Sequence, residues 1–114
     1  MKGYKIDIKK EARKNSHLLT HEEICNTIKQ VADEFALTKV VYFGSYADGK
    51  ATKKSDLDIL VEFAKRDVGI LKIIDLRQTL EEKFKIPVDV IHLPIPEDSF
   101  LEIGNTVVAY ENLR

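Results

Sequence analysis

The sequence predicts a small α/β (α+β) domain in which helices flank a central mixed β-sheet. Two observations support this fold class. Segments with apolar residues at helical spacing alternate with apolar runs of strand length, and the chain has 114 residues, the size of one domain. The predicted order along the chain is helix, strand, strand, helix, strand, helix, as in a layered domain.

A capping-box pattern marks the start of the first predicted helix. Thr20 is a suitable N-cap residue, and Glu23 follows three positions later. Apolar residues then recur at helical spacing, which predicts a helix over about 21–36. The apolar run at 40–43 is typical of a buried strand, and residues 45–49 fit one short helical turn.

The middle of the chain is predicted to contain a second strand and a second helix. Residues 50–54 form an exposed basic loop, and the apolar run at 57–63 predicts the strand. Asp67 is a candidate N-cap for a helix over about 68–84, which also has an apolar stripe.

The last part of the domain is predicted from an apolar run and from its breakers. The run at 86–91 indicates a third strand, because Pro87 lies near its start, where proline is tolerated. A short helix over 97–104 should end at Gly104, and residues 106–110 should form a short strand or turn.

Composition narrows the possible functions. The formal net charge is −1, so no overall basic field would recruit nucleic acid, and no direct nucleic-acid binding is expected. No apolar run is long enough for a membrane span, and no apolar leader is visible. Together with a single cysteine, Cys25, these features predict a cytoplasmic protein. Residues 1–19 are predicted to be an N-terminal arm, either flexible or partly ordered, and 20–114 to be the domain.

Two carboxylates at the start of the second predicted strand are the first sign of chemistry. Asp56 and Asp58 are one residue apart, so they share a face of the strand. Two like charges about 5 Å apart repel by roughly 3 kcal/mol at an effective dielectric constant of about 20. A bound cation would turn this repulsion into attraction, and strand-end carboxylates that simply face solvent are the alternative.

Asp89 and a Gly-Ser pair extend this candidate site. Asp89 would join Asp56 and Asp58 if the third strand lies beside the second, and three carboxylates on one sheet face can hold two Mg²⁺ ions. Gly44 permits close backbone approach, and Ser45 can bind phosphate oxygens while also capping the turn. These residues predict a metal-dependent nucleotide site, with Asp89 placed to accept a proton.

The Gly44-Ser45 pair, ten intervening residues, and then Asp56-x-Asp58 resemble the signature of the DNA polymerase beta-like nucleotidyltransferases. The short chain and the strand around Asp89 are similar to the minimal nucleotidyltransferase (MNT) group. The resemblance covers about residues 22–110.

This resemblance implies a nucleotidyltransferase fold and Mg²⁺-dependent transfer of a nucleoside monophosphate. Gly44 and Ser45 would bind the triphosphate, while Asp56, Asp58 and Asp89 would hold metal and carry the catalysis. It further implies an antitoxin that transfers AMP from ATP to a tyrosine of a HEPN-domain RNase toxin.

One residue departs from the family pattern and keeps other functions open. Many relatives carry arginine where this chain has Asp48, which removes a phosphate contact and adds repulsion; Lys50, Lys53 and Lys54 could compensate. The alternatives are a non-catalytic antitoxin that blocks its toxin by direct binding and a small-molecule nucleotidyltransferase of the antibiotic-modifying kind. The sequence leaves the oligomeric state open.

Overall fold

The computed structural model describes residues 18–65, 67–92 and 103–112. The described elements form one four-stranded mixed sheet in the order β3-β2-β1-β4, with two helices and one 3-10 turn. In chain order these are α2 (His21–Ala32), β1 (Leu37–Phe43), η1 (Gly44–Tyr46), β2 (Leu57–Phe63), α3 (Ile70–Phe84), β3 (Val88–His92) and β4 (Thr106–Glu111).

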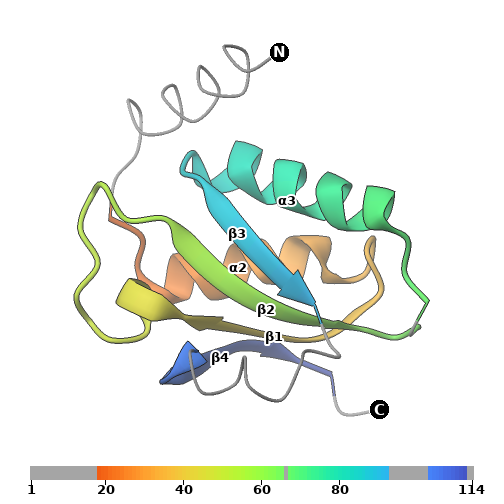
Figure 1. Cartoon of the computed structure of the whole chain (residues 1–114), viewed down its shortest axis with the longest axis horizontal. Helices are drawn as coiled ribbons and strands as arrows, with labels where there is room; N and C mark the ends of the chain where they lie inside the picture. The colour runs from red at the N-terminus through yellow and green to blue at the C-terminus, as the bar shows by residue number, and fades with distance from the viewer. Residues whose placement is uncertain (1–17, 66, 93–102, 113–114) are drawn as a thin grey trace.

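Both helices pack against the same face of the sheet (Figure 1). Strand β1 is central and pairs antiparallel with both β2 and β4, whereas β2 and β3 are parallel. Parallel neighbours need a crossover connection, and α3 supplies it between β2 and β3. The predicted mixed sheet flanked by helices is therefore confirmed.

Helix α2 begins where the capping box predicts. The Thr20 side chain accepts a hydrogen bond from the Glu23 backbone N–H at 3.1 Å, and the Glu23 carboxylate accepts one from the Thr20 N–H at 2.9 Å. The predicted end at residue 36 is wrong, because the helix ends at Ala32. Ala36 has a φ of 54°, a left-handed conformation that no helix can continue, and it turns the chain into β1.

Removing the cap should destabilise the domain measurably. For Thr20→Ala we expect a loss of about 1 kcal/mol in the free energy of unfolding. The backbone N–H of Glu23 loses its hydrogen-bond acceptor, the Thr20 hydroxyl, and the reciprocal capping box is broken. Urea denaturation measures this loss. Asn26→Ala, an exposed position within the same helix, is the matched control and should change stability by less than about 0.5 kcal/mol. Equal effects of the two substitutions would contradict the capping role.

The predicted strand at 57–63 is present with these bounds as β2, while β1 starts three residues before the predicted 40. Helix α3 starts at Ile70 with Gly69 as its N-cap, so the predicted cap at Asp67 is wrong. Strand β3 starts at Val88, after Pro87, whose carbonyl accepts a hydrogen bond from the Leu57 N–H at 3.0 Å.

The end of the described chain agrees in part with the prediction. The predicted strand at 106–110 is present as β4. Gly104 has a φ of 71°, as expected of a glycine that ends a helix, while residues 97–102 of the predicted short helix lie outside the described residues. The predicted arm at 1–19 falls outside them too, apart from its last two residues.

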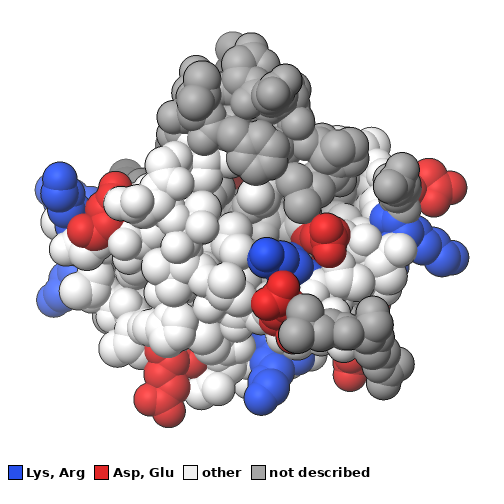
Figure 2. Space-filling view, turned by 90° about the horizontal axis from the view of Figure 1, so that it is seen from below, with Lys and Arg blue, Asp and Glu red and all other residues white. Residues whose placement is uncertain are grey.

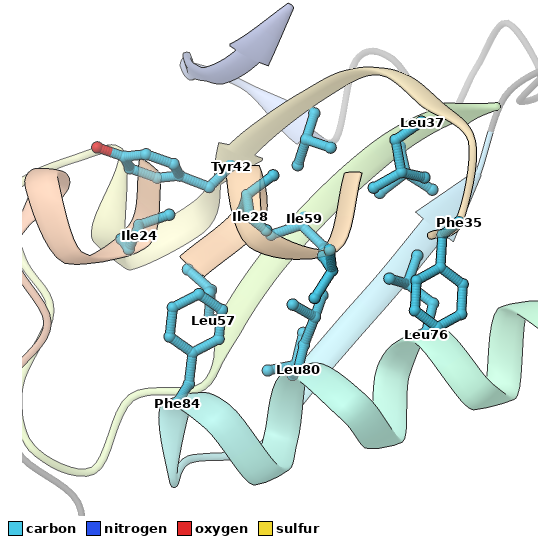
Figure 3. Packing of buried hydrophobic residues seen from close by; sticks show 14 of the residues in the cluster. Ile24, Ile28, Phe35, Leu37, Tyr42, Leu57, Ile59, Leu76, Leu80 and Phe84 are labelled. Atoms are coloured by element: carbon cyan, nitrogen blue, oxygen red, sulfur yellow. The ribbon is translucent and has the colours of Figure 1, made fainter. Parts of the chain in front are cut away.

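The main hydrophobic core lies between the sheet and the two helices (Figure 3). Alternate residues of β1 and β2 face this core, and the helices contribute their buried stripes. The residues labelled in Figure 3 are Ile24, Ile28, Phe35, Leu37, Tyr42, Leu57, Ile59, Leu76, Leu80 and Phe84. Burial of this apolar surface holds the strand ends in place for the candidate site.

The opposite face of the sheet carries a second, smaller apolar cluster. Val41, Leu60 and Ile103 are buried there, and Phe43 and Ile91 pack against them. In the view from below, acidic and basic side chains of the described residues are interspersed beside a broad uncharged area (Figure 2). Among the helices of the described residues, none has the length and apolar character needed to cross a membrane.

Candidate active site

The site is built on the face of the sheet that lies away from the helices. Strands β2 and β3 pair so that Asp58 lies directly beside Asp89, and Asp58 also faces Phe43 of β1. Ile59, the next residue of β2, points to the helix side and is fully buried. Because side chains alternate along a strand, this burial forces Asp58 onto the other face. The structure thus brings together the two carboxylates that the sequence placed on separate strands.

The charge of Asp58 is poorly accommodated without a cation. The pKa of its carboxyl group is raised to about 6, first by burial and then by the negative charge of Asp89, a side-chain hydrogen bond with Asp89 and the charge of Asp56. A hydrogen bond between two carboxyl groups needs a shared proton. The site therefore favours either a proton or a metal ion between these side chains.

Gly44 allows the Gly44-Ser45 turn to lie directly against this carboxylate. Its φ is 71°, and a Cβ atom added there would overlap Oδ2 of Asp58. Any other residue would be strained by its backbone and would also displace the acid. The Gly-Ser turn and the second strand are thus in contact, as the spacing of the motif predicted.

The turn that carries Ser45 is closed by its own backbone. The Gly44 carbonyl accepts hydrogen bonds from the N–H groups of Ala47 and Asp48, and the Ser45 carbonyl accepts one from Lys50 at 2.9 Å. Ser45 itself is half-buried. The predicted helical turn at 45–49 is thus present in part, as the 3-10 turn η1 over Gly44–Tyr46 followed by a hydrogen-bonded turn.

Asp48, the residue that departs from the family pattern, has a structural partner. Its Oδ1 accepts a hydrogen bond at 3.2 Å from Nδ2 of Asn105, which precedes β4. This bond joins the turn to the start of the edge strand. An acid at this position therefore helps to fix the turn.

Two aromatic residues hold the turn and β1 against the start of α2, and sequence reasoning missed these contacts. The Tyr46 hydroxyl accepts a hydrogen bond from the Leu19 N–H at 3.3 Å, and the Tyr42 hydroxyl lies 2.7 Å from Nδ1 of His21. Tyr42 is 4% exposed, so its hydroxyl needs a partner. In the sequence, the position of Tyr46 directly after Ser45 indicates a residue near the turn, but nothing indicates its partner Leu19.

The donor chemistry of the site fits Mg²⁺ through Asp58 and Asp89. Hard cations such as Mg²⁺ prefer carboxylate oxygens, and this pair is close enough to share a hydrogen bond. Asp56 is half-buried and near enough to act on the charge of Asp58. Among the residues that the structure describes, however, no group of three or more His, Cys, Asp or Glu side chains is already arranged to hold a metal ion. The metal roles of Asp56, Asp58 and Asp89 therefore stay predictions.

Ionisation of Asp58 should lower the free energy of unfolding of the metal-free protein as pH rises. Because the folded-state pKa of about 6 exceeds the ordinary value of 3.8, the folded protein binds this proton more tightly than the unfolded chain does. The resulting stability is fully present below about pH 4 and is lost as pH rises through about 6. Urea denaturation in EDTA measures this trend.

The comparison with Asp58→Asn isolates this effect from other titrating groups. In EDTA, the stability of the variant relative to the wild type should increase between about pH 4 and pH 7. With Mg²⁺ at about pH 7, the wild type should instead be the more stable of the two. Parallel pH curves for the two proteins would show that Asp58 titrates normally.

Comparison with known proteins identifies the family. Residues 24–110 match the family model described as the nucleotidyltransferase domain. The chain belongs to this nucleotidyltransferase family. A protein adenylyltransferase, MntA, of Thermococcus cleftensis is 36% identical over 78 residues, which cover 65% of this chain and 78% of that protein. A candidate protein adenylyltransferase of Methanocaldococcus jannaschii is 33% identical over 63 residues, 55% of this chain and 63% of the relative.

Solved structures confirm the nucleotidyltransferase fold. A toxin–antitoxin crystal structure with AMP-PNP matches with a TM-score of 0.66 at 22% identity, covering 77% of this chain and 73% of that one. A tri-AMPylated HEPN toxin of Shewanella oneidensis in complex with MNT antitoxin contains a chain that matches with a TM-score of 0.62 at 18% identity, covering 82% and 74%. At these identities the likeness establishes the fold of this nucleotidyltransferase.

Proposed function

We propose that this chain is a Mg²⁺-dependent protein adenylyltransferase that transfers AMP from ATP to a tyrosine of a HEPN-type RNase toxin and thereby acts as its antitoxin. The observation that carries the proposal is the Asp58–Asp89 pair lying against the Gly44 turn. Relatives named protein adenylyltransferase and a structural neighbour complexed with an AMPylated HEPN toxin support it. A cytoplasmic location, where ATP is available, follows from the same proposal.

Each residue has a defined task in this reaction. Gly44 and Ser45 would hold the β- and γ-phosphates at the end of β1, and Asp56, Asp58 and Asp89 would hold the metal. When bound, Mg²⁺ would neutralise the negative charge of the phosphates and lower the pKa of the attacking hydroxyl.

The transfer itself is an in-line displacement. The tyrosine oxygen forms a bond to the α-phosphorus, the bond from the α-phosphorus to its bridging oxygen breaks, and pyrophosphate leaves with that electron pair. Asp89 would accept the phenol proton, and its exposed position on β3 beside Asp58 supports this role.

The decisive experiment combines the purified chain, ATP labelled at the α-phosphate, Mg²⁺ and the HEPN-domain protein encoded beside it. We expect label to appear on a tyrosine of that protein, with loss of its RNase activity and dependence on Mg²⁺. Mass spectrometry identifies the modified residue. Inhibition of the RNase without any label on it would instead establish a non-catalytic antitoxin that acts by direct binding.

A further inference from the structure

A groove of about 370 Å³ lies on the same sheet face as the candidate catalytic carboxylates. Its apolar floor is formed by Val41 and Leu60, and Leu60 follows Asp58 by two residues on β2. Ile103, Gly104 and Thr106 form one wall, and Lys39 and Glu62 lie at the end away from the carboxylates. The volume is in the range of small-ligand sites, about 300–1,000 Å³.

The order of features along the strands places the groove floor and the Gly44-Ser45 turn on opposite sides of Asp58. The turn η1 follows the end of β1, Asp58 pairs with the last residue of β1, and the groove residue Val41 pairs with Leu60 further back. Asp58 therefore lies between the phosphate-binding turn and the groove floor, while the wall residue Thr106, which also pairs with Phe43, is level with it across β1. In an in-line displacement the attacking group approaches the α-phosphorus from the side opposite to the leaving pyrophosphate. The groove lies on the side of the attacking group.

The charges at one end of the groove also distinguish between the nucleotide and the acceptor polypeptide as its occupant. Lys39 is already paired with Glu111, with 3.6 Å between Nζ and Oε2, and Glu62 adds a further negative charge. Glu111 lies outside the groove lining, but together with Lys39 and Glu62 it gives these three side chains a net charge of −1, which opposes phosphate groups. The apolar floor fits an uncharged aromatic side chain, and the acidic end fits a cationic residue next to it.

A hydrogen bond connects the groove wall with the nucleotide side of the site. Asn105, between the wall residues Gly104 and Thr106, donates to Asp48 of the phosphate-binding turn. The wall and the turn thus form one continuous surface past the carboxylates. An occupant of the groove would lie next to the bound nucleotide.

Resting on the proposed function, we infer that this groove binds the acceptor: the tyrosine side chain and a basic neighbouring residue of the polypeptide to be adenylylated. Val41, Leu60 and Ile103 would contact the aromatic ring. Glu62 and Glu111 would attract the basic neighbour.

The groove can be blocked without changing the catalytic residues. Thr106→Trp places a large side chain at the groove wall, on an exposed edge-strand position where an aromatic residue is tolerated. Leu71→Trp is the control, because Leu71 is 78% exposed on α3, which packs against the opposite face of the sheet, and lies outside the groove lining. Relative to this control, Thr106→Trp should raise KM for the HEPN-domain acceptor at least about tenfold and leave KM for ATP unchanged. An equal rise in KM for ATP would overturn the inference and assign the groove to the nucleoside.

A binding measurement tests the groove independently of transfer. With AMP-PNP and Mg²⁺ present, N-acetyl-arginyl-tyrosinamide should shift the backbone amide NMR signals of Val41, Leu60 and Thr106, and Glu62→Lys should weaken its binding at least about threefold. N-acetyl-glutamyl-tyrosinamide should bind more weakly than the arginyl peptide.

The two experiments separate this inference from the proposed function. Transfer to the HEPN-domain protein with no response of the groove signals to the peptide overturns the acceptor groove alone. Peptide binding in the groove without any transfer overturns the proposed function and leaves the groove assignment standing. Shifts of the groove signals by AMP-PNP alone, with none on adding peptide, overturn the acceptor assignment.

Discussion

Asp58→Asn should abolish adenylyl transfer while leaving the protein folded. We expect kcat/KM to fall on the order of 10²–10³-fold or more, because the substitution removes the carboxylate that lies between Asp89 and the Gly44 turn. The shape of the side chain is kept, and the asparagine amide can donate a hydrogen bond to Asp89 in place of the shared proton. Initial rates of ATP-dependent labelling measure the loss.

Stability measurements show whether this loss is chemical or structural. Because burial and neighbouring acids disfavour the charge of Asp58, the variant should melt no lower than the wild type in EDTA at neutral pH. It should also lose most of the thermal stabilisation that Mg²⁺ gives to the wild type. Asp75→Asn, an exposed aspartate on α3, is the matched control and should retain wild-type activity. Transfer by Asp58→Asn within a few-fold of wild type would contradict the assigned site.

Much of the fold could be predicted because local signals and tertiary structure agree. The capping box at Thr20 is satisfied by the side chain and backbone contacts that define it. The end of the same helix could not be predicted in this way. Phe35 continues the apolar periodicity and is buried, but it lies in a turn, and nothing in the residue type of Ala36 indicates a positive φ.

The candidate site shows the same division between local and distant information. Strand alternation predicts that Asp56 and Asp58 share a face, but the approach of Asp89 depends on β3 pairing in parallel with β2 in one register. The bond between Asp48 and Asn105 joins residues 57 positions apart. No local pattern indicates such a contact, so Asp48 could be interpreted from the sequence only as a departure from the family.

Gly44→Ala and Gly49→Ala form a matched pair that tests the contact between the turn and Asp58, the proposed catalytic carboxylate. Both glycines have a positive φ, 71° and 72°, so each alanine should cost about 1–2 kcal/mol through backbone strain. They differ in surroundings, because a Cβ at Gly44 would overlap the Asp58 carboxylate, whereas nothing lies within 4 Å of one at Gly49. The difference between the variants therefore reports the contact and not the strain.

We expect Gly49→Ala to lose stability but keep its transfer activity once folded. Gly44→Ala should lose more stability and, in addition, about 10²-fold in kcat/KM, because a displacement of Asp58 by about 1 Å misplaces a carboxylate that we propose holds the metal. In the double variant Gly44→Ala/Asp58→Asn, activity should fall no further than in Asp58→Asn alone, because both changes remove the same interaction. Steady-state kinetics and urea denaturation measure the two quantities. Independent, multiplicative losses in the double variant would mean that Gly44 acts on the phosphates and not through Asp58.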